Sequence, residues 1–218
     1  MSAVMSFDGA TLYVSVGPNP RLVRMFLAEK GVTIPEQVID LRGGENRRAP
    51  YLEMNPGGQM PALRLASGQV IAETVPICEY VEDVAPEPAF IGPTSEERAE
   101  TRMWVRRVEQ LYVRPMIDAY RYGHALALFG ERMRCIPEAT PELKSLARDG
   151  EAWIETNMVG PFLAGDRMSL ADIIMYCMMD FAEQREVLTR DPSLVKLPEW
   201  FDRMAARPSA ESSRALAY

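Results

Sequence analysis

The sequence predicts an α/β domain at residues 10–86, followed by an all-α domain at residues 95–218. In the first part, short apolar and β-branched runs alternate with an amphipathic helical segment, which is typical of a sheet covered by helices. Beyond residue 94 the periodic segments have helical spacing, and no strand pattern recurs. Proline and glycine residues in the stretch 87–94 predict a linker between the two domains.

The first domain opens with a strand, a helix and a second strand. Leu12–Ser15 predicts the first strand, and Pro20–Lys30 predicts an amphipathic helix that Gly31 closes. Val38–Leu41 predicts the second strand. The connection between two such strands should be right-handed.

A hairpin and a second helix complete this domain. Ala66–Gly68 predicts a turn between the strands Leu63–Leu65 and Gln69–Ala72. Thr74 is the expected N-cap of a helix that runs to about Val84, because the apolar residues that follow recur at helical spacing.

The second domain begins with a long helix that Thr94 or Ser95 should cap. We expect this helix to run toward residue 119, with further helices around residues 120–134, 141–157, 170–181 and 199–207. Ser169 and Asp172 have the spacing of a capping box before an apolar helix. That pair predicts a device for folding rather than for chemistry.

Composition argues against several classes of function. A net charge of −7 and a pI near 5.0 argue against a nucleic-acid partner, which requires a basic surface. The chain lacks an apolar run of membrane-spanning length, and its first residues lack the pattern of a signal peptide, so we expect a cytoplasmic protein without a membrane partner. Cys78, Cys135 and Cys177 are expected to be free buried thiols, and with His124 as the one histidine no metal site is expected.

The stretch from residue 55 to residue 83 carries the strongest ligand-binding pattern. Pro61 cannot donate to a sheet ladder, so the backbone of Met60 before it should stay available to a ligand. The helix start at Thr74 suits a carboxylate, and the adjacent Glu73 suits an ammonium group. The two residues together fit the zwitterionic end of an amino acid. A helix cap without a ligand is the alternative.

These residues resemble the glutathione site of the glutathione S-transferase superfamily, and the Ser169–Asp172 capping box resembles that of the family's helical domain. The resemblance extends from about residue 10 to residue 209. It implies the fold of that family, an N-terminal thioredoxin-like βαβ-ββα domain followed by a C-terminal helical bundle. It also implies glutathione as a co-substrate, without a metal.

The resemblance implies specific contacts to glutathione. The Met60–Pro61 bond should be cis, so that the backbone of Met60 pairs with the cysteinyl unit. Arg47 and Asn46 should both lie near the glycine carboxylate, and a solvated surface arginine is the alternative for Arg47. The full set of expected glutathione-binding residues is Arg47, Gln59, Met60, Pro61, Glu73 and Thr74.

The group that stabilises the glutathione thiolate is less evident. Relatives use a tyrosine, serine or cysteine near the first strand and helix, but the usual serine position holds Pro18 here. This departure resembles an atypical fungal and bacterial class that lacks the usual residue. The candidates are Ser15, which could instead be structural, and Asn19, which caps the first helix and could equally serve only as a cap. His124 is a third candidate as a proton carrier, although a lone histidine on such a helix is more often structural.

Four residues of the helical domain are candidates for the wall of an apolar electrophile pocket, although residues at this spacing commonly belong to a core. They are Tyr112, Met116, Tyr120 and Tyr122.

The leading functional hypothesis is a glutathione transferase that joins the glutathione thiol to electrophilic small molecules, in a detoxification or catabolic step. A glutathione-dependent reductase or peroxidase is the first alternative, weakened because the segment 13–21 contains no cysteine. A non-catalytic module that binds glutathione or a protein is the second.

The resemblance also implies a homodimer. Basic residues of one subunit would then meet acidic residues of the other. The residues expected there are Arg102, Arg106 and Arg107 on one side and Glu79, Glu82 and Asp83 on the other.

Overall fold

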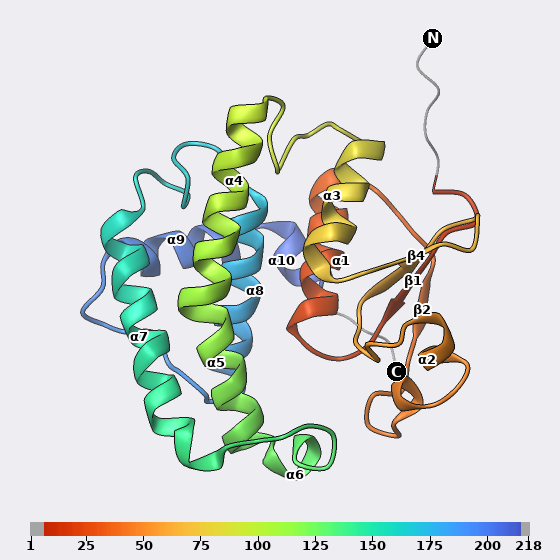
Figure 1. Cartoon of the computed structure of the whole chain (residues 1–218). Helices are drawn as coiled ribbons and strands as arrows, with labels where there is room; N and C mark the ends of the chain where they lie inside the picture. The colour runs from red at the N-terminus through yellow and green to blue at the C-terminus, as the bar shows by residue number, and fades with distance from the viewer. Residues whose placement is uncertain (1–6, 215–218) are drawn as a thin grey trace. The chain divides into compact units, whose positions relative to one another are not determined.

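The computed structural model describes residues 7–214, which form two compact units (Figure 1). Unit 1 contains the chain up to Ala89 together with the C-terminal segment that begins at Arg207, and unit 2 contains Phe90–Ala206. The change of unit falls inside the predicted linker. The C-terminal segment differs from the prediction of a helical domain up to residue 218, because helix α10 (Pro208–Ser212) contacts helix α1 (Pro18–Lys30) of unit 1.

Unit 1 is built on a four-stranded mixed sheet with the strand order β2-β1-β3-β4. The strands are β1 (Thr11–Val14), β2 (Glu36–Val38), β3 (Ala62–Arg64) and β4 (Val70–Ala72). β1 is parallel to β2 and antiparallel to β3, and β3 is antiparallel to β4. The short helices η1 (Glu45–Arg47) and α2 (Tyr51–Met54) precede β3, and α3 (Thr74–Val84) follows β4. This order confirms the predicted thioredoxin-like domain.

The two faces of the sheet bury different residues because side chains alternate along a strand. Leu12 pairs with Leu63, and neither side chain has exposed surface. Helices α1 and α3 lie side by side along the sheet (Figure 1). Tyr13 and Ala62 point to the opposite face, where they join a cluster that includes Tyr51 of α2.

Boundaries of the four strands and of α1 differ from the prediction: β3 begins and ends one residue earlier, and β4 begins one residue later. β1 begins and ends one residue earlier, and β2 covers residues 36–38 instead of 38–41. β2 is an edge strand, and all three of its residues are exposed. Its sequence therefore lacks the apolar alternation from which a strand is predicted. α1 begins at Pro18 rather than Pro20, because Gly17 occupies the N-cap with φ 128° and ψ 169°, a conformation open mainly to glycine.

Unit 2 is helical through most of its described length. Its α-helices are α4 (Ser95–Val108), α5 (Arg114–Ala119), α6 (Leu126–Phe129), α7 (Thr140–Asn157), α8 (Leu170–Gln184) and α9 (Lys196–Ala205). Two π-helical segments, η2 (Glu109–Val113) and η3 (Tyr120–His124), and the 3₁₀ turn η4 (Pro137–Ala139) lie between them. The helix predicted at residues 120–134 is therefore shorter and broken.

Both predicted helix caps of unit 2 are confirmed. Thr94 forms a capping box with Glu97 at the start of α4. At α8, the backbone N–H and the hydroxyl of Ser169 both donate to Oδ2 of Asp172 at 2.8 Å. Oδ1 of Asp172 accepts from the N–H of Leu163 and from Nε1 of Trp200, both at 2.9 Å. Burial raises the pKa of Asp172, although these hydrogen bonds favour its charged form.

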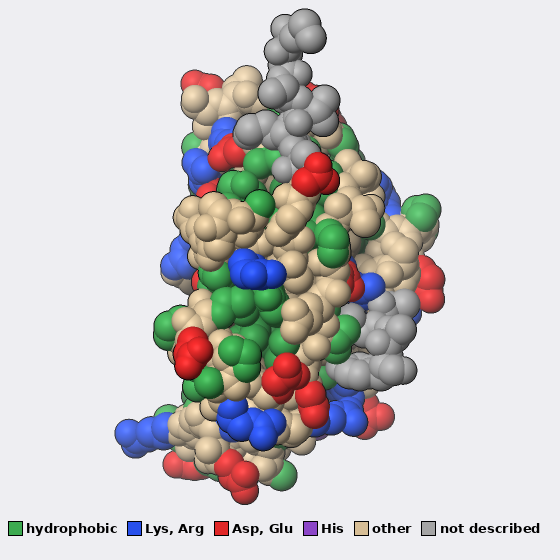
Figure 2. Space-filling view, turned by 90° about the vertical axis from the view of Figure 1, so that its right-hand side faces the viewer, with side chains coloured by type: hydrophobic (Ala, Val, Ile, Leu, Met, Phe, Trp, Pro, Cys, Tyr) green, Lys and Arg blue, Asp and Glu red, His purple; other side chains and the backbone are tan. Residues whose placement is uncertain are grey.

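Charges of both signs are mixed on the surface shown in Figure 2. Lys and Arg side chains lie among Asp and Glu side chains, and a group of hydrophobic side chains lies near the centre of that view. Among residues 7–214, no helix is long and apolar enough to cross a membrane.

Candidate functional site

The predicted ligand-binding residues of unit 1 meet at one edge of its sheet. The strand register pairs Tyr13 with Ala62, and Ala62 with Ala72. The next residue in the same direction is Pro61 on one strand and Glu73 on the other, so the Met60–Pro61 and Glu73–Thr74 segments lie beside each other. The end of β1, which leads into α1, reaches the same edge.

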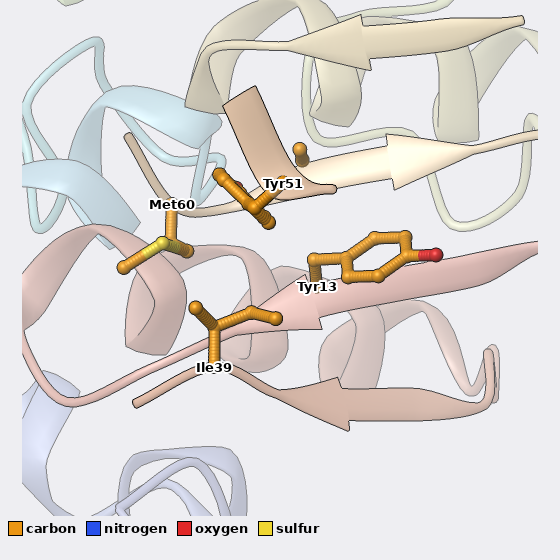
Figure 3. Close-up of a cluster of buried hydrophobic side chains, with 5 residues drawn as sticks. Tyr13, Ile39, Tyr51 and Met60 are labelled. Atoms are coloured by element: carbon orange, nitrogen blue, oxygen red, sulfur yellow. The ribbon is translucent and has the colours of Figure 1, made fainter. Parts of the chain in front are cut away.

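Met60 presents its backbone at this edge while its side chain is buried. The Met60–Pro61 bond is cis, as predicted. Neither the N–H nor the C=O of Met60 forms a backbone hydrogen bond within the described part of the chain. The side chain packs with Tyr13, Ile39 and Tyr51, and the residue as a whole is 8% exposed (Figure 3). This division leaves a backbone donor and an acceptor available to an extended peptide ligand.

Three buried side chains donate hydrogen bonds to the loop that leads to Met60. Asn46 Nδ2 donates to the carbonyl of Gly58 at 2.6 Å. The Tyr51 hydroxyl and Asn55 Nδ2 both donate to the carbonyl of Gln59, at 2.6 and 2.8 Å. Sequence reasoning missed Tyr51 and Asn55, and it placed Asn46 beside the ligand, whereas the Asn46 side chain is only 2% exposed and bonds to the loop.

Glu73 rather than Thr74 occupies the N-cap of α3, which corrects the prediction. Glu73 has φ 73° and ψ 140°, a region that non-glycine residues rarely occupy and that costs about 1–3 kcal/mol. Its exposed carboxylate makes no hydrogen bond or ion pair with any residue in the range 7–214. Thr74 is half-buried in the first turn, where helix N–H groups have no intrahelical acceptor. A carboxylate and a set of N–H donors therefore lie next to each other.

Arg47 lies beside the same loop, and Gln59 belongs to it. Both side chains are exposed. Gly58 has φ +60°, and a Cβ at this position would lie 3.3 Å from Nη1 of Arg47 and 3.0 Å from the carbonyl oxygen of Asn46. The guanidinium of Arg47 thus lies against the loop at its solvent side, within reach of an anionic group held there.

The start of α1 differs from the predicted cap. Asn19 is the second residue of the helix, and its side chain makes no capping hydrogen bond. Pro18 and Pro20 have no N–H, and the N–H of Arg21 donates to Gly17 at 3.5 Å. Within the described chain, the backbone N–H of Asn19 is therefore the free donor of the first turn.

Ser15 lies at the end of β1 but is turned into the protein. Its side chain has no exposed surface, and its hydroxyl donates to the carbonyl of Ile39 at 2.7 Å. This bond joins β1 to the chain that follows β2. It matches the structural role that the sequence left open for Ser15.

The predicted electrophile-pocket residues divide into two groups. Tyr112 and Met116 are 1% and 0% exposed, so they belong to the core of unit 2 and not to a surface wall. Burial raises the pKa of Tyr112 well above its usual value. Tyr120 and Tyr122 are half-buried on η3, and His124 is exposed at the end of that segment.

The Tyr120 ring packs against two other aromatic rings. Its ring lies edge-on to Phe181, with centroids 4.8 Å apart, and to Phe129 at 6.3 Å. A separate groove of about 440 Å³ in unit 2 contains none of the four predicted pocket residues. It is lined by Gln110, Leu111, Arg114, Pro115, Leu143, Leu146, Asp149, Gly150 and Trp153.

Further predictions concern cysteines, metals and acidic residues. Cys78 and Cys177 are buried thiols outside any disulfide, as predicted, whereas Cys135 is partly exposed. Across the described residues, no group of three His, Cys, Asp or Glu side chains could hold a metal ion. Glu82 cannot face a partner subunit as expected, because it is 2% exposed and pairs with Lys30 at 3.3 Å.

Both parts of the chain match known family descriptions. Residues 16–84 match "Glutathione S-transferase, N-terminal domain", and residues 117–208 match "Glutathione S-transferase, C-terminal domain".

Individual relatives and a solved structure are similar over most of the chain. Glutathione S-transferase 2 of Saccharomyces cerevisiae is 30% identical over 200 residues, which cover 89% of this chain and 84% of that protein. A crystal structure of a glutathione S-transferase domain-containing protein from Marinobacter aquaeolei has a TM-score of 0.85 and 33% identity, and covers 91% of this chain and 98% of that one. FtsZ-localized protein A of Caulobacter vibrioides is 28% identical over 215 residues, 94% of this chain and 90% of that protein.

Proposed function

The chain belongs to the glutathione S-transferase superfamily, and we propose that it catalyses the addition of the glutathione thiol to electrophilic small molecules. Such a reaction would serve in a detoxification or catabolic step. Glutathione is then a co-substrate, and no metal takes part. We place this protein in the cytoplasm as a homodimer, a state that light scattering at micromolar concentration tests.

The observation that carries this proposal is the sheet edge where Met60 and Glu73 lie beside each other. Glutathione has three parts that the edge matches in order. The α-ammonium of its γ-glutamyl unit pairs with the exposed carboxylate of Glu73, and the α-carboxylate accepts from Thr74 and the start of α3. The cysteinyl unit pairs with the backbone of Met60, and the glycine carboxylate lies toward Arg47.

Conjugation further requires the thiol as a thiolate, although a free thiol has a pKa of about 8.5. The start of α1 favours the anion through its positive end and through the free N–H of Asn19. The thiolate sulfur then bonds to the electrophilic carbon, and the displaced electron pair departs with the leaving group of an aryl halide or moves onto the oxygen of an epoxide or enone, which then takes up a proton. Because the Ser15 hydroxyl is engaged with Ile39, no side-chain hydroxyl is assigned as the sole activator.

A protein-binding role is the second candidate, and it rests on the similarity to FtsZ-localized protein A. A redox role through a mixed disulfide is weaker, because a nucleophilic cysteine has to be accessible. Cys78 on α3 is fully buried, and the edge segments contain no other cysteine.

Calorimetric titration with glutathione, followed by two assays on the same sample, tests the proposal. We expect binding, conjugation to chlorodinitrobenzene, and little reduction of a mixed glutathione disulfide. Binding without conjugation to any of a panel of aryl halides, epoxides and enones would favour the non-catalytic module. Reduction that exceeds conjugation would favour the redox role.

A further inference from the structure

The two peptide units before Met60 are fixed by side chains rather than by a sheet ladder. Loop residues 56–61 lie between α2 and β3, outside any strand. Within the loop, the carbonyl of Gly58 accepts one side-chain hydrogen bond, and the carbonyl of Gln59 accepts two. We call the three donors, Asn46, Tyr51 and Asn55, the loop clamp.

The clamp acts on the peptide plane that contains the N–H of Met60. The carbonyl of Gln59 and the N–H of Met60 belong to one planar peptide unit and point in opposite directions. Because Tyr51 and Asn55 draw the Gln59 carbonyl inward at 2.6 and 2.8 Å, the N–H of Met60 points outward. The direction of the Met60 N–H thus depends on the buried side chains of Tyr51 and Asn55.

The clamp is itself held rigidly. Tyr51 is 3% exposed, and its ring lies edge-on to Tyr13, with centroids 6.0 Å apart. Asn55 is 6% exposed. Its backbone N–H donates to the carbonyl of Tyr51, and its carbonyl accepts from the N–H of Gly58. The clamp side chains are buried, so they reach a ligand only through the loop.

Asn46 adds an observation of its own. Its Nδ2 donates to Gly58, while its Oδ1 is buried and finds no hydrogen-bond partner among the described residues. A buried acceptor without a partner is unfavourable. An apolar side chain would avoid this cost but could not hold Gly58.

We propose that Asn46, Tyr51 and Asn55 are positioning residues that aim the backbone of Met60 at the cysteinyl unit of a γ-glutamyl peptide ligand. The inference rests on the proposed function, since it takes glutathione as that ligand. It assigns recognition of the ligand's central peptide unit to buried donors on η1 and α2, separate from the Glu73–Thr74 contacts to the γ-glutamyl end.

Tyr51→Phe tests the proposal, because it deletes the donor and keeps the ring in its cluster. Tyr13→Phe is the matched control: it removes a hydroxyl from the same cluster that makes no hydrogen bond to the loop, and the Tyr13 oxygen points away from Met60 in Figure 3. Asn55→Asp is the second clamp variant, and it replaces the Nδ2 donor by an acceptor. Near-UV circular dichroism and thermal melts establish that each variant is folded.

We expect Tyr51→Phe to bind glutathione about five- to tenfold more weakly by calorimetry, as for the loss of one buried hydrogen bond, and Asn55→Asp at least as weakly. Tyr13→Phe should stay within about twofold of the wild type. In conjugation kinetics, KM for glutathione should rise in Tyr51→Phe while kcat stays within about twofold, whereas a loss of folded enzyme would lower kcat at constant KM. Hydrogen exchange of the Met60 amide should slow when glutathione binds the wild type, and less so in Tyr51→Phe.

Distinct results overturn the inference and the function. If the wild type binds glutathione but folded Tyr51→Phe and Asn55→Asp bind equally well, the clamp has no positioning role. If glutathione binds without slowing Met60 exchange, the backbone contact is wrong. If the wild type shows no binding at all, the proposed function fails, and the clamp proposal fails with it.

Discussion

Arg207 donates two parallel hydrogen bonds to the carboxylate of Glu29, from Nε at 2.5 Å and from Nη2 at 2.7 Å. The Ser209 hydroxyl donates to the same carboxylate. Glu29 lies in the last turn of α1, and its side chain is 9% exposed. This bidentate pair fastens the C-terminal segment to the helix whose other end lies at the candidate site.

We predict that Glu29→Gln lowers the free energy of unfolding by about 1–3 kcal/mol at neutral pH, because the variant loses charge-assisted hydrogen bonds. Burial alone would raise the pKa of Glu29, but the hydrogen bonds from Arg207 and Ser209 outweigh it and hold the pKa below 4.5. A depressed carboxyl pKa contributes stability above the unfolded-state pKa, and this contribution disappears as the pH falls through the folded-state value.

Urea denaturation of both proteins from neutral pH to below pH 4.5 measures this effect. The stability difference should shrink in the acid range. Glu211→Gln is the control, since that side chain is 84% exposed and lies 3.8 Å from Arg214. A difference between wild type and Glu29→Gln that stays constant with pH would contradict the assignment.

A second prediction concerns the capping box of α8. Asp172→Ala should destabilise the protein by about 3–5 kcal/mol, because it leaves four buried donors without an acceptor. One of those donors is Nε1 of Trp200, so indole fluorescence reports on the site as well as thermal melting does. Asp166→Ala, at an exposed position of the preceding turn, should change the melting temperature little. Equal melting temperatures for the two variants would refute this role of Asp172.

Local spacing explains which parts of the fold could be predicted. The box of Ser169 and Asp172 is encoded by two residue types three positions apart, and the structure contains it as expected. The start of α1 could not be predicted in the same way. Asn19 followed by Pro20 imitates a cap signal, but the helix begins earlier because Gly17 adopts φ 128°.

The candidate site was predictable where its residues belong to a recognisable motif, and not where side chains bond to the backbone. Glu73 and Met60 lie within a recognisable motif. Asn46, Tyr51 and Asn55 bond to carbonyls 4 to 12 residues away, and a backbone carbonyl is the same for every residue type. Helical spacing likewise identified the stripe of Tyr112 and Met116 without telling whether it faces a pocket or the core.

The third prediction separates stability from function at Glu73. Glu73→Gly should raise the free energy of unfolding by about 1 kcal/mol, since glycine tolerates the φ of 73°, and should weaken glutathione binding by about 2–3 kcal/mol through loss of the carboxylate. Glu186→Gly is the matched control, because Glu186 is an exposed glutamate with φ 55° in unit 2. It should stabilise the protein and leave binding unchanged. Unaltered glutathione affinity in Glu73→Gly would remove Glu73 from the site.

The last prediction concerns the thiolate, which we expect the backbone N–H of Asn19 to stabilise more than any single hydroxyl. Asn19→Ala keeps this N–H, and Asn19→Pro removes it at a first-turn position that tolerates proline. In Asn19→Pro the pKa of bound glutathione, followed by thiolate absorbance, should return toward about 8.5, and kcat/KM at neutral pH should fall at least about tenfold. Asn19→Ala should resemble the wild type.

Side-chain variants complete the test of thiolate stabilisation. Ser15→Ala should cost at most about tenfold in kcat/KM, because its hydroxyl already donates to Ile39, and His124→Ala tests the rival role of a proton carrier. If Ser15→Ala abolishes conjugation while glutathione still binds, Ser15 is the dedicated activator. The start of α1 would then contribute only its position.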